Sequence, residues 1–227
     1  MQIKLFDSTE QQTTTKPHIV GMQCYRQLFV LNLYAGLGGN RKHWQNVKVT
    51  AIEKDEKIAN VYRRNFPEDE VIIADAHEYL QENFDKYDFI WSSPPCQSHS
   101  KMIRSGRNRK PRFADLKLYE EIIFLQTYYK GKWVVENVKP YYEPLIKPTA
   151  TLGRHLFWAN FNIPKFDPPS FPNMMGRQNL EAKKELQDWL GIHYDENIYY
   201  ENNHCPTQIL RNCVHPALGL HVFQSCL

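Results

Sequence analysis

The 227-residue sequence lacks any apolar run long enough to cross a membrane. Its longest apolar run lies around Leu28, Val30 and Leu31, whereas a membrane-spanning helix needs about 20 such residues. The polar segment from Met1 to Lys16 also lacks the apolar core of a secretion signal. We therefore expect a soluble cytoplasmic protein that makes no contact with a membrane.

Cysteine and glycine are both scarce. The five cysteines are odd in number and irregularly spaced, which argues against a disulfide framework and fits a reducing compartment. With 10 glycines and 14 prolines, collagen-like and low-complexity chains are excluded. The histidines and cysteines between residues 204 and 215 do not follow a common zinc spacing, so we predict no metal site.

Acidic residues are absent from residues 97–113, although the whole chain has a net charge of only +3. This segment has a charge of +6, while the rest of the chain has 22 basic and 25 acidic residues. Such a segment is either a solvated surface loop or a phosphate-binding loop. Its basic residues are Lys101, Arg104, Arg107, Arg109, Lys110 and Arg112.

Segments typical of strands and helices alternate through the first two thirds of the chain. This alternation predicts an α/β fold with a doubly wound, mostly parallel sheet, which binds ligands beyond the carboxyl ends of its strands. The expected strands are 28–34, 47–52, 71–73, 87–91, 133–135 and 156–163. The expected helices are 40–46, 55–66, 77–80, 115–129, 180–190 and parts of 207–224, where Pro216 interrupts.

Three motifs follow the expected strands. Residues 34–39 (Tyr-Ala-Gly-Leu-Gly-Gly) form a glycine turn after the first strand, while Glu53 and Asp75 end the next two. Glycines let a cofactor approach the backbone, and an acid at a strand end can bind ribose hydroxyl groups. A glycine turn occurs in many sheet proteins, however, so this motif by itself leaves a purely structural turn open.

The second and third motifs contain reactive side chains. Cys96 follows two rigid prolines at a strand end, which suits a nucleophile; its polar neighbours argue against the alternative of a buried structural thiol. Glu136 lies in the segment Glu-Asn-Val at 136–138, which ends the next strand. Its carboxylate either faces Cys96 across one pocket or forms a strand-terminal salt bridge.

The order and spacing of these motifs resemble those of the C5-cytosine DNA methyltransferases. The matching segments are Pro-Pro-Cys-Gln at 94–97 and Glu-Asn-Val at 136–138, together with the glycine motif. Residues 208–214 resemble the final motif of that family, with its Asn at Asn212. The resemblance covers roughly residues 28–163 and 180–224.

The resemblance implies the fold of S-adenosylmethionine-dependent methyltransferases and methyl transfer to C5 of a flipped-out cytosine in double-stranded DNA, with S-adenosylhomocysteine as product. Cys96 would attack C6, Glu136 would hold N3 and the exocyclic amine, and Arg154 would contact O2. The basic segment, with all six residues named above, would bind DNA phosphates. The implied cofactor contacts are Tyr34, Gly36, Leu37, Gly38, Gly39, Glu53, Asp75, Pro94 and Asn212.

The chain also departs from the pattern of the family. Only one arginine, Arg154, lies in residues 153–158, where the family has an arginine-rich motif, and Asn32 replaces the usual acid before the glycine motif. Only residues 159–206 are left for target recognition. We therefore expect a minimal recognition region, or one that is completed by a homodimer or a partner protein. The predicted organisation is an extension (1–26), a catalytic and cofactor-binding domain (27–158), a small irregular recognition region (159–206) and a returning C-terminal segment (207–227).

Two other functions stay open. The enzyme could methylate cytosine in RNA, or the chain could be a catalytically silent module that binds DNA or a partner. We favour DNA methylation in a bacterial or phage-infected cell, within restriction–modification, phage protection or regulation.

Overall fold

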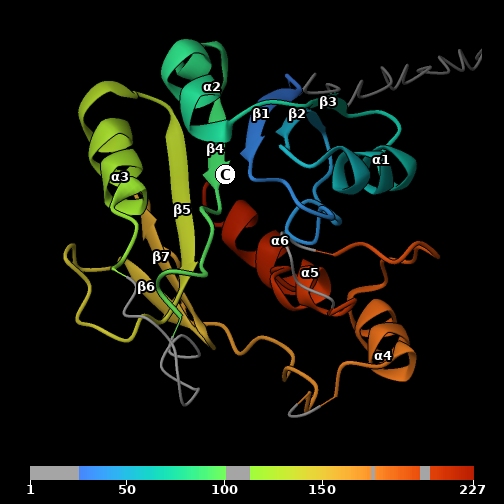
Figure 1. Cartoon of the computed structure of the whole chain (residues 1–227). Coiled ribbons are helices and arrows are strands. Elements are labelled where there is room, and N and C mark those ends of the chain that lie inside the picture. Colours follow the sequence, from blue (N-terminus) through green and yellow to red (C-terminus); the bar gives the residue numbers. More distant parts are fainter. Residues whose placement is uncertain (1–25, 101–112, 175–176, 200–204) are drawn as a thin grey trace, which may run out of the picture.

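A seven-stranded sheet with the strand order β3-β2-β1-β4-β5-β7-β6 organises the protein (Figure 1). The structure is a computed structural model that describes residues 26–100, 113–174, 177–199 and 205–227. The first five strands are parallel, whereas β7 is antiparallel to both β5 and β6. The strands are β1 (Leu28–Leu33), β2 (Val47–Ile52), β3 (Glu70–Ile72), β4 (Phe89–Ser92), β5 (Lys132–Val138), β6 (Ala150–Leu152) and β7 (His155–Ala159).

Helices cover both faces of this sheet. One hydrophobic core joins α1 and α6 to one face, and a second joins α2 and α3 to the other. This arrangement confirms the predicted doubly wound fold with a mostly parallel sheet. The helices are α1 (Glu56–Asn65), α2 (Ala76–Asn83), the 3-10 helix η1 (Phe84–Lys86), α3 (Lys117–Tyr128), α4 (Leu180–Leu190), α5 (Gln208–Arg211) and α6 (Pro216–Gln224).

Helix boundaries follow from local capping. The Asp55 carboxylate accepts hydrogen bonds from the backbone N–H groups of residues 57 and 58, at 2.8 and 3.2 Å, and so begins α1. Asp75 caps α2 in the same way. Pro216 occupies the first position of α6, where a missing N–H costs nothing, so this proline begins a helix rather than interrupting one.

The C-terminal third of the chain returns to the sheet. Phe223 of α6 stacks on Trp44, with ring centroids 5.0 Å apart, in the core against β1, β2 and β4. Helices α4 and α5 pack together farther from the sheet, on a third cluster that includes Leu37 (Figure 1). The predicted division into four segments stays a prediction, and residues 1–25 of its N-terminal extension lie outside the described part.

Two further expectations about elements are wrong. Residues 40–46 form turns instead of a short helix, because the Asn40 amide donates to Asn32 and the Arg41 guanidinium to Asp69. The final predicted strand ends at Ala159, and β6 was not expected.

No helix among the described residues is long and apolar enough to cross a membrane.

Candidate active site

The order of strands reverses between β1 and β4, and the predicted motifs lie at this point. The glycine motif follows β1, and Cys96 follows β4. In open α/β sheets, ligands bind in the crevice outside the strand ends at such a reversal. The topology therefore brings the predicted cofactor loop and the predicted nucleophile to one edge of the sheet.

Cys96 is half-buried between the exposed residues Pro95 and Gln97. Burial and the negative charge of Glu136 raise the pKa of the Cys96 thiol to about 11, while the positive charge of Arg154 opposes this shift. Both charges act on Cys96, so the structure brings the three predicted catalytic residues together. At neutral pH the thiol is protonated and must lose its proton before it can attack.

Glu136 is buried and accepts one hydrogen bond on each carboxylate oxygen. The Ser93 hydroxyl donates to Oε2 at 2.9 Å, and the His155 ring lies with Nδ1 2.6 Å from Oε1. Ser93 follows β4, and His155 begins β7, which pairs with β5. The carboxylate is therefore fixed from both neighbouring strands.

Arg154 lies in the turn between β6 and β7. Its Nε donates to His155 Nε2 at 3.1 Å, and one terminal nitrogen donates to the backbone carbonyl of Arg211 at 2.6 Å. The guanidinium also lies over the Phe171 ring, with its carbon 4.4 Å from the centroid. Arg154 thus links the catalytic sheet to the C-terminal segment, and its contact with a cytosine stays a prediction.

The loop that carries Cys96 is anchored on both sides. The Asn137 amide donates to the Pro94 carbonyl at 2.9 Å, and the His99 N–H donates to the Cys96 carbonyl at 3.0 Å. His99 is itself buried and pairs through Nδ1 with the Tyr142 hydroxyl at 2.5 Å. These contacts hold the thiol at a defined place beside β5.

The glycines of the predicted cofactor loop differ in what surrounds them. A Cβ on Gly36 would meet no atom closer than 3.9 Å, whereas one on Gly38 would collide with Phe66 and one on Gly39 with the carbonyl of Val214. Gly36 and Gly38 both have positive φ, at 55° and 80°. Gly36 alone of the three has open space for a ligand, while Gly38 and Gly39 permit close packing.

The residues at the ends of β1, β2 and β3 fit S-adenosylmethionine. Glu53 accepts hydrogen bonds from the N–H groups of Gly36 and Asp55, both at 2.9 Å, which brings its carboxylate next to the open space at Gly36. Asp75 is half-buried at the start of α2. Carboxylates beside an uncovered glycine suit ribose hydroxyl and amine groups. Contacts by these and the other predicted residues, including Leu37, which packs in a core, and Asn212, which ends α5, stay predictions.

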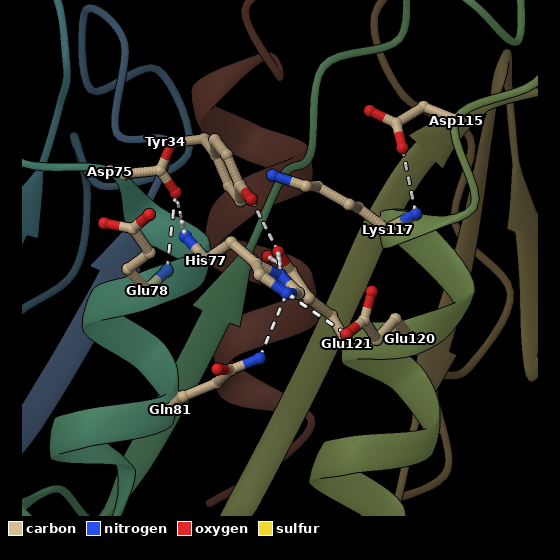
Figure 2. A network of polar contacts seen from close by, with 10 residues as sticks. Tyr34, Asp75, His77, Glu78, Gln81, Asp115, Lys117, Glu120 and Glu121 are labelled. Carbon is tan, nitrogen blue, oxygen red and sulfur yellow. Dashed lines mark hydrogen bonds and ion pairs between the residues drawn. The ribbon is translucent and has the colours of Figure 1, made fainter.

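A second buried carboxylate, Glu121 of α3, lies in a network of polar contacts with Tyr34 and His77 (Figure 2). It accepts hydrogen bonds from the Tyr34 hydroxyl at 2.5 Å and the Ser92 hydroxyl at 2.6 Å. His77 Nδ1 lies 3.1 Å from the same carboxylate, and this contact raises the pKa of His77. Burial and Glu121 together raise the pKa of Tyr34 well above its usual value.

Some predicted residues cannot be placed. The basic residues at 101–112, predicted to bind DNA, lie outside the described residues. Within the described parts of the chain, no group of three or more His, Cys, Asp or Glu side chains could hold a metal ion.

Sequence reasoning missed His155, Ser93 and Glu121. Glu121 could have been found, because it falls on the helical face that also carries Leu118 and Ile122, where a carboxylate must be buried. His155 gave no comparable signal, because its contact with Glu136 depends on the register of β5 and β7.

Residues 28–144 match the model of the family described as C-5 cytosine-specific DNA methylase, which is about half of the chain. The chain belongs to this family. The match confirms the predicted resemblance and S-adenosylmethionine as the cofactor.

Curated relatives of the chain are RNA enzymes by name. The mouse and human proteins named tRNA (cytosine(38)-C(5))-methyltransferase are 32% identical over 120 residues and 35% identical over 86 residues. These stretches cover 49% and 35% of this chain, but only 29% and 22% of the relatives.

Solved structures are similar over part of the chain. A DNMT2 mutant from Spodoptera frugiperda has a TM-score of 0.37 and 27% identity over 49% of this chain and 36% of its own. A putative methylase from Haemophilus influenzae has a TM-score of 0.41 and 20% identity over 59% of this chain and 86% of its own.

Proposed function

We propose that the protein transfers a methyl group to C5 of a cytosine in double-stranded DNA through a covalent adduct with Cys96. The observation that carries this proposal is the cluster of Cys96, Glu136 and Arg154 at the reversal of strand order. A nucleophile, a fixed carboxylate and a cation beside a predicted cofactor loop suit addition to a pyrimidine ring.

The chemistry follows from the two reactive side chains. Cytosine is a poor nucleophile at C5, so the Cys96 sulfur first bonds to C6 while N3 takes a proton next to Glu136. The thiol loses one proton and N3 gains one, so the addition neither takes up nor releases a proton overall. Because the pKa of the Cys96 thiol is about 11, the thiol is protonated at neutral pH. Loss of the thiol proton, bonding of the sulfur to C6 and protonation of N3 therefore occur together.

S-adenosylmethionine supplies an electrophilic methyl group when it is bound. Gly36, Glu53 and Asp75 would hold it beyond the ends of β1, β2 and β3. After C5 has gained the methyl group, a base removes the C5 proton, the carbon–sulfur bond breaks and the Cys96 sulfur leaves as thiolate. The proton on N3 then returns to the sulfur, which gives neutral 5-methylcytosine and restores the thiol. The cytosine must leave its helical stack to reach Cys96, so base flipping is part of the proposal.

Methylation of tRNA is the second candidate. The names of the mouse and human relatives favour it. The description of the matching family favours DNA. The basic segment next to the nucleophile, which we propose as the phosphate-binding loop, suits the phosphates of either nucleic acid. A role in restriction–modification or phage protection, and a homodimer or partner that completes recognition, stay predictions.

The test uses the purified full chain with labelled S-adenosylmethionine and, in parallel, double-stranded DNA and tRNA. We expect 5-methylcytosine in DNA from the wild type and none from Cys96→Ala. Methylation of tRNA alone would replace the substrate in this proposal. No product and no covalent trapping on 5-fluorocytosine in either nucleic acid would instead leave a silent binding module.

A further inference from the structure

The His155 ring lies between the two charged groups of the site. It is buried, with Nε2 3.1 Å from Arg154 Nε and Nδ1 2.6 Å from Glu136 Oε1. The contact with Glu136 is as short as charge-assisted hydrogen bonds become. The His155 ring therefore bridges Arg154 and Glu136 through one hydrogen bond to each.

The arginine determines which nitrogen of His155 carries the proton. A guanidinium only donates hydrogen bonds, so His155 Nε2 must accept one and carries no proton. The proton of the neutral ring is then on Nδ1, which donates to Glu136.

Ser93 completes the arrangement at the other oxygen of Glu136. The Trp91 indole N–H donates to Ser93 Oγ at 2.8 Å, which turns the hydroxyl proton toward Glu136 Oε2, 2.9 Å away. Each carboxylate oxygen thus receives one donor from the protein. A carboxylate oxygen has two acceptor sites, so one site on each oxygen is left for a ligand.

We propose that His155 is a positioning residue that, through its Nδ1–H, holds Glu136 as a carboxylate with its two remaining acceptor sites aimed at the cytosine. This inference rests on the proposed function. One acceptor site receives the exocyclic amine, and the other receives the proton on N3. The two protein donors and these two N–H groups then occupy all four acceptor sites of the carboxylate, so N3 keeps its proton and the ring is activated toward Cys96.

This role differs from that predicted for Arg154. The arginine acts through His155, whose tautomer it fixes, and through the backbone carbonyl of Arg211. The titratable groups that face Glu136 are then His155 from β7, Cys96 from the loop after β4 and Arg154 from the turn before β7.

Two substitutions separate the two nitrogens of the ring. The side-chain amide of His155→Asn reaches the place of Nδ1 and keeps a donor toward Glu136. The longer His155→Gln reaches the place of Nε2 and keeps the contact with Arg154 but loses that donor. The pair is matched, because both variants introduce a neutral amide of similar polarity.

The measurement is exchange of the C5 hydrogen of cytosine with solvent, which reports ring activation without methyl transfer, together with kcat and KM for methylation. The substrate is whichever nucleic acid the wild type methylates. For His155→Gln and His155→Ala we expect exchange and kcat to fall about 10- to 100-fold, the range for loss of a hydrogen bond to a charged group. KM and S-adenosylmethionine binding stay unchanged, and His155→Asn stays within about threefold of the wild type.

Nitrogen NMR of the His155 ring tests the tautomer without catalysis. We expect a protonated Nδ1 and a bare Nε2 in the neutral ring, and a neutral ring with its proton on Nε2 would overturn the inference. An active wild type with an undiminished His155→Gln would overturn the inference and leave the proposed function standing. A wild type that neither exchanges C5 hydrogen nor methylates overturns the proposed function, and the catalytic role of His155 with it.

Discussion

Two buried carboxylates, Glu121 and Glu136, lie on opposite sides of the same strand ends and differ in what is left open to a ligand. Glu121 is fully buried and accepts from two hydroxyl groups, with an imidazole as a third contact. Glu136 has two protein contacts and acts electrostatically on a half-buried thiol. Burial alone therefore does not mark a catalytic carboxylate.

A catalytic carboxylate differs from a structural one in that some of its hydrogen-bond acceptor sites are left free beside a reactive group. The Glu121 network ties α3 to β1, β4 and α2, and its partners come from this chain (Figure 2). Such a network stabilises one arrangement of the strand ends. Glu136 has the same kind of donors but one fewer, and its charge acts on Cys96.

The largest effect is expected from Glu136→Gln. A carboxamide cannot hold both the N3 proton and the amine of cytosine as acceptors, so methylation should fall at least about 100-fold. The free energy of unfolding should fall by about 1–3 kcal/mol, because the new amide meets the donors Ser93 and His155. Activity assays and urea denaturation of both Glu→Gln variants check this, and equal loss of activity in Glu121→Gln would break the comparison.

Glu121→Gln should also lower stability. The new amide presents N–H groups to a site that is surrounded by donors, which should cost about 1–3 kcal/mol. Urea-induced unfolding followed by tryptophan fluorescence measures the change. Unfolding curves that coincide with those of the wild type would show that the Glu121 network does not stabilise the fold.

A smaller effect is expected on the alkylation rate of Cys96, which should respond to Glu136 and not to Glu121. With a thiol pKa of about 11, about one Cys96 in a thousand is ionised at pH 8. Removing the negative charge of Glu136 lowers that pKa, so Glu136→Gln should be alkylated several-fold faster at pH 8. Mass spectrometry of the peptide that contains Cys96 gives the rate. A rate unchanged by Glu136→Gln but changed by Glu121→Gln would reverse the two roles.

The smallest expected effect is a pH dependence of stability from His77. Its hydrogen bond to Glu121 raises the pKa of His77 above its usual 6.5, so this contribution is fully present below about pH 6.5 and is lost as pH rises through the folded-state pKa. The difference in unfolding free energy between the wild type and His77→Gln should shrink between pH 6 and 9. A difference that grows over this range would contradict the assignment.

Much of the fold could be predicted from the sequence. The bounds of β2 and α4 match the expected segments, because an apolar run, an N-cap and a terminal glycine are local signals. The turns at 40–46 could not be predicted, since Arg41 is drawn into a buried ion pair with Asp69, 28 residues away. Local helix propensity does not contain that contact.

The sequence by itself determined the chemical type of the site. The order of Cys96 and Glu136 in their motifs predicts a nucleophile and a carboxylate at adjacent strand ends. The tertiary structure alone decided that His155 and Ser93 are the partners of Glu136. The physical reason is register: pairing of β5 with β7 joins residues about twenty positions apart, and a slip of one residue would turn His155 to the other face of the sheet.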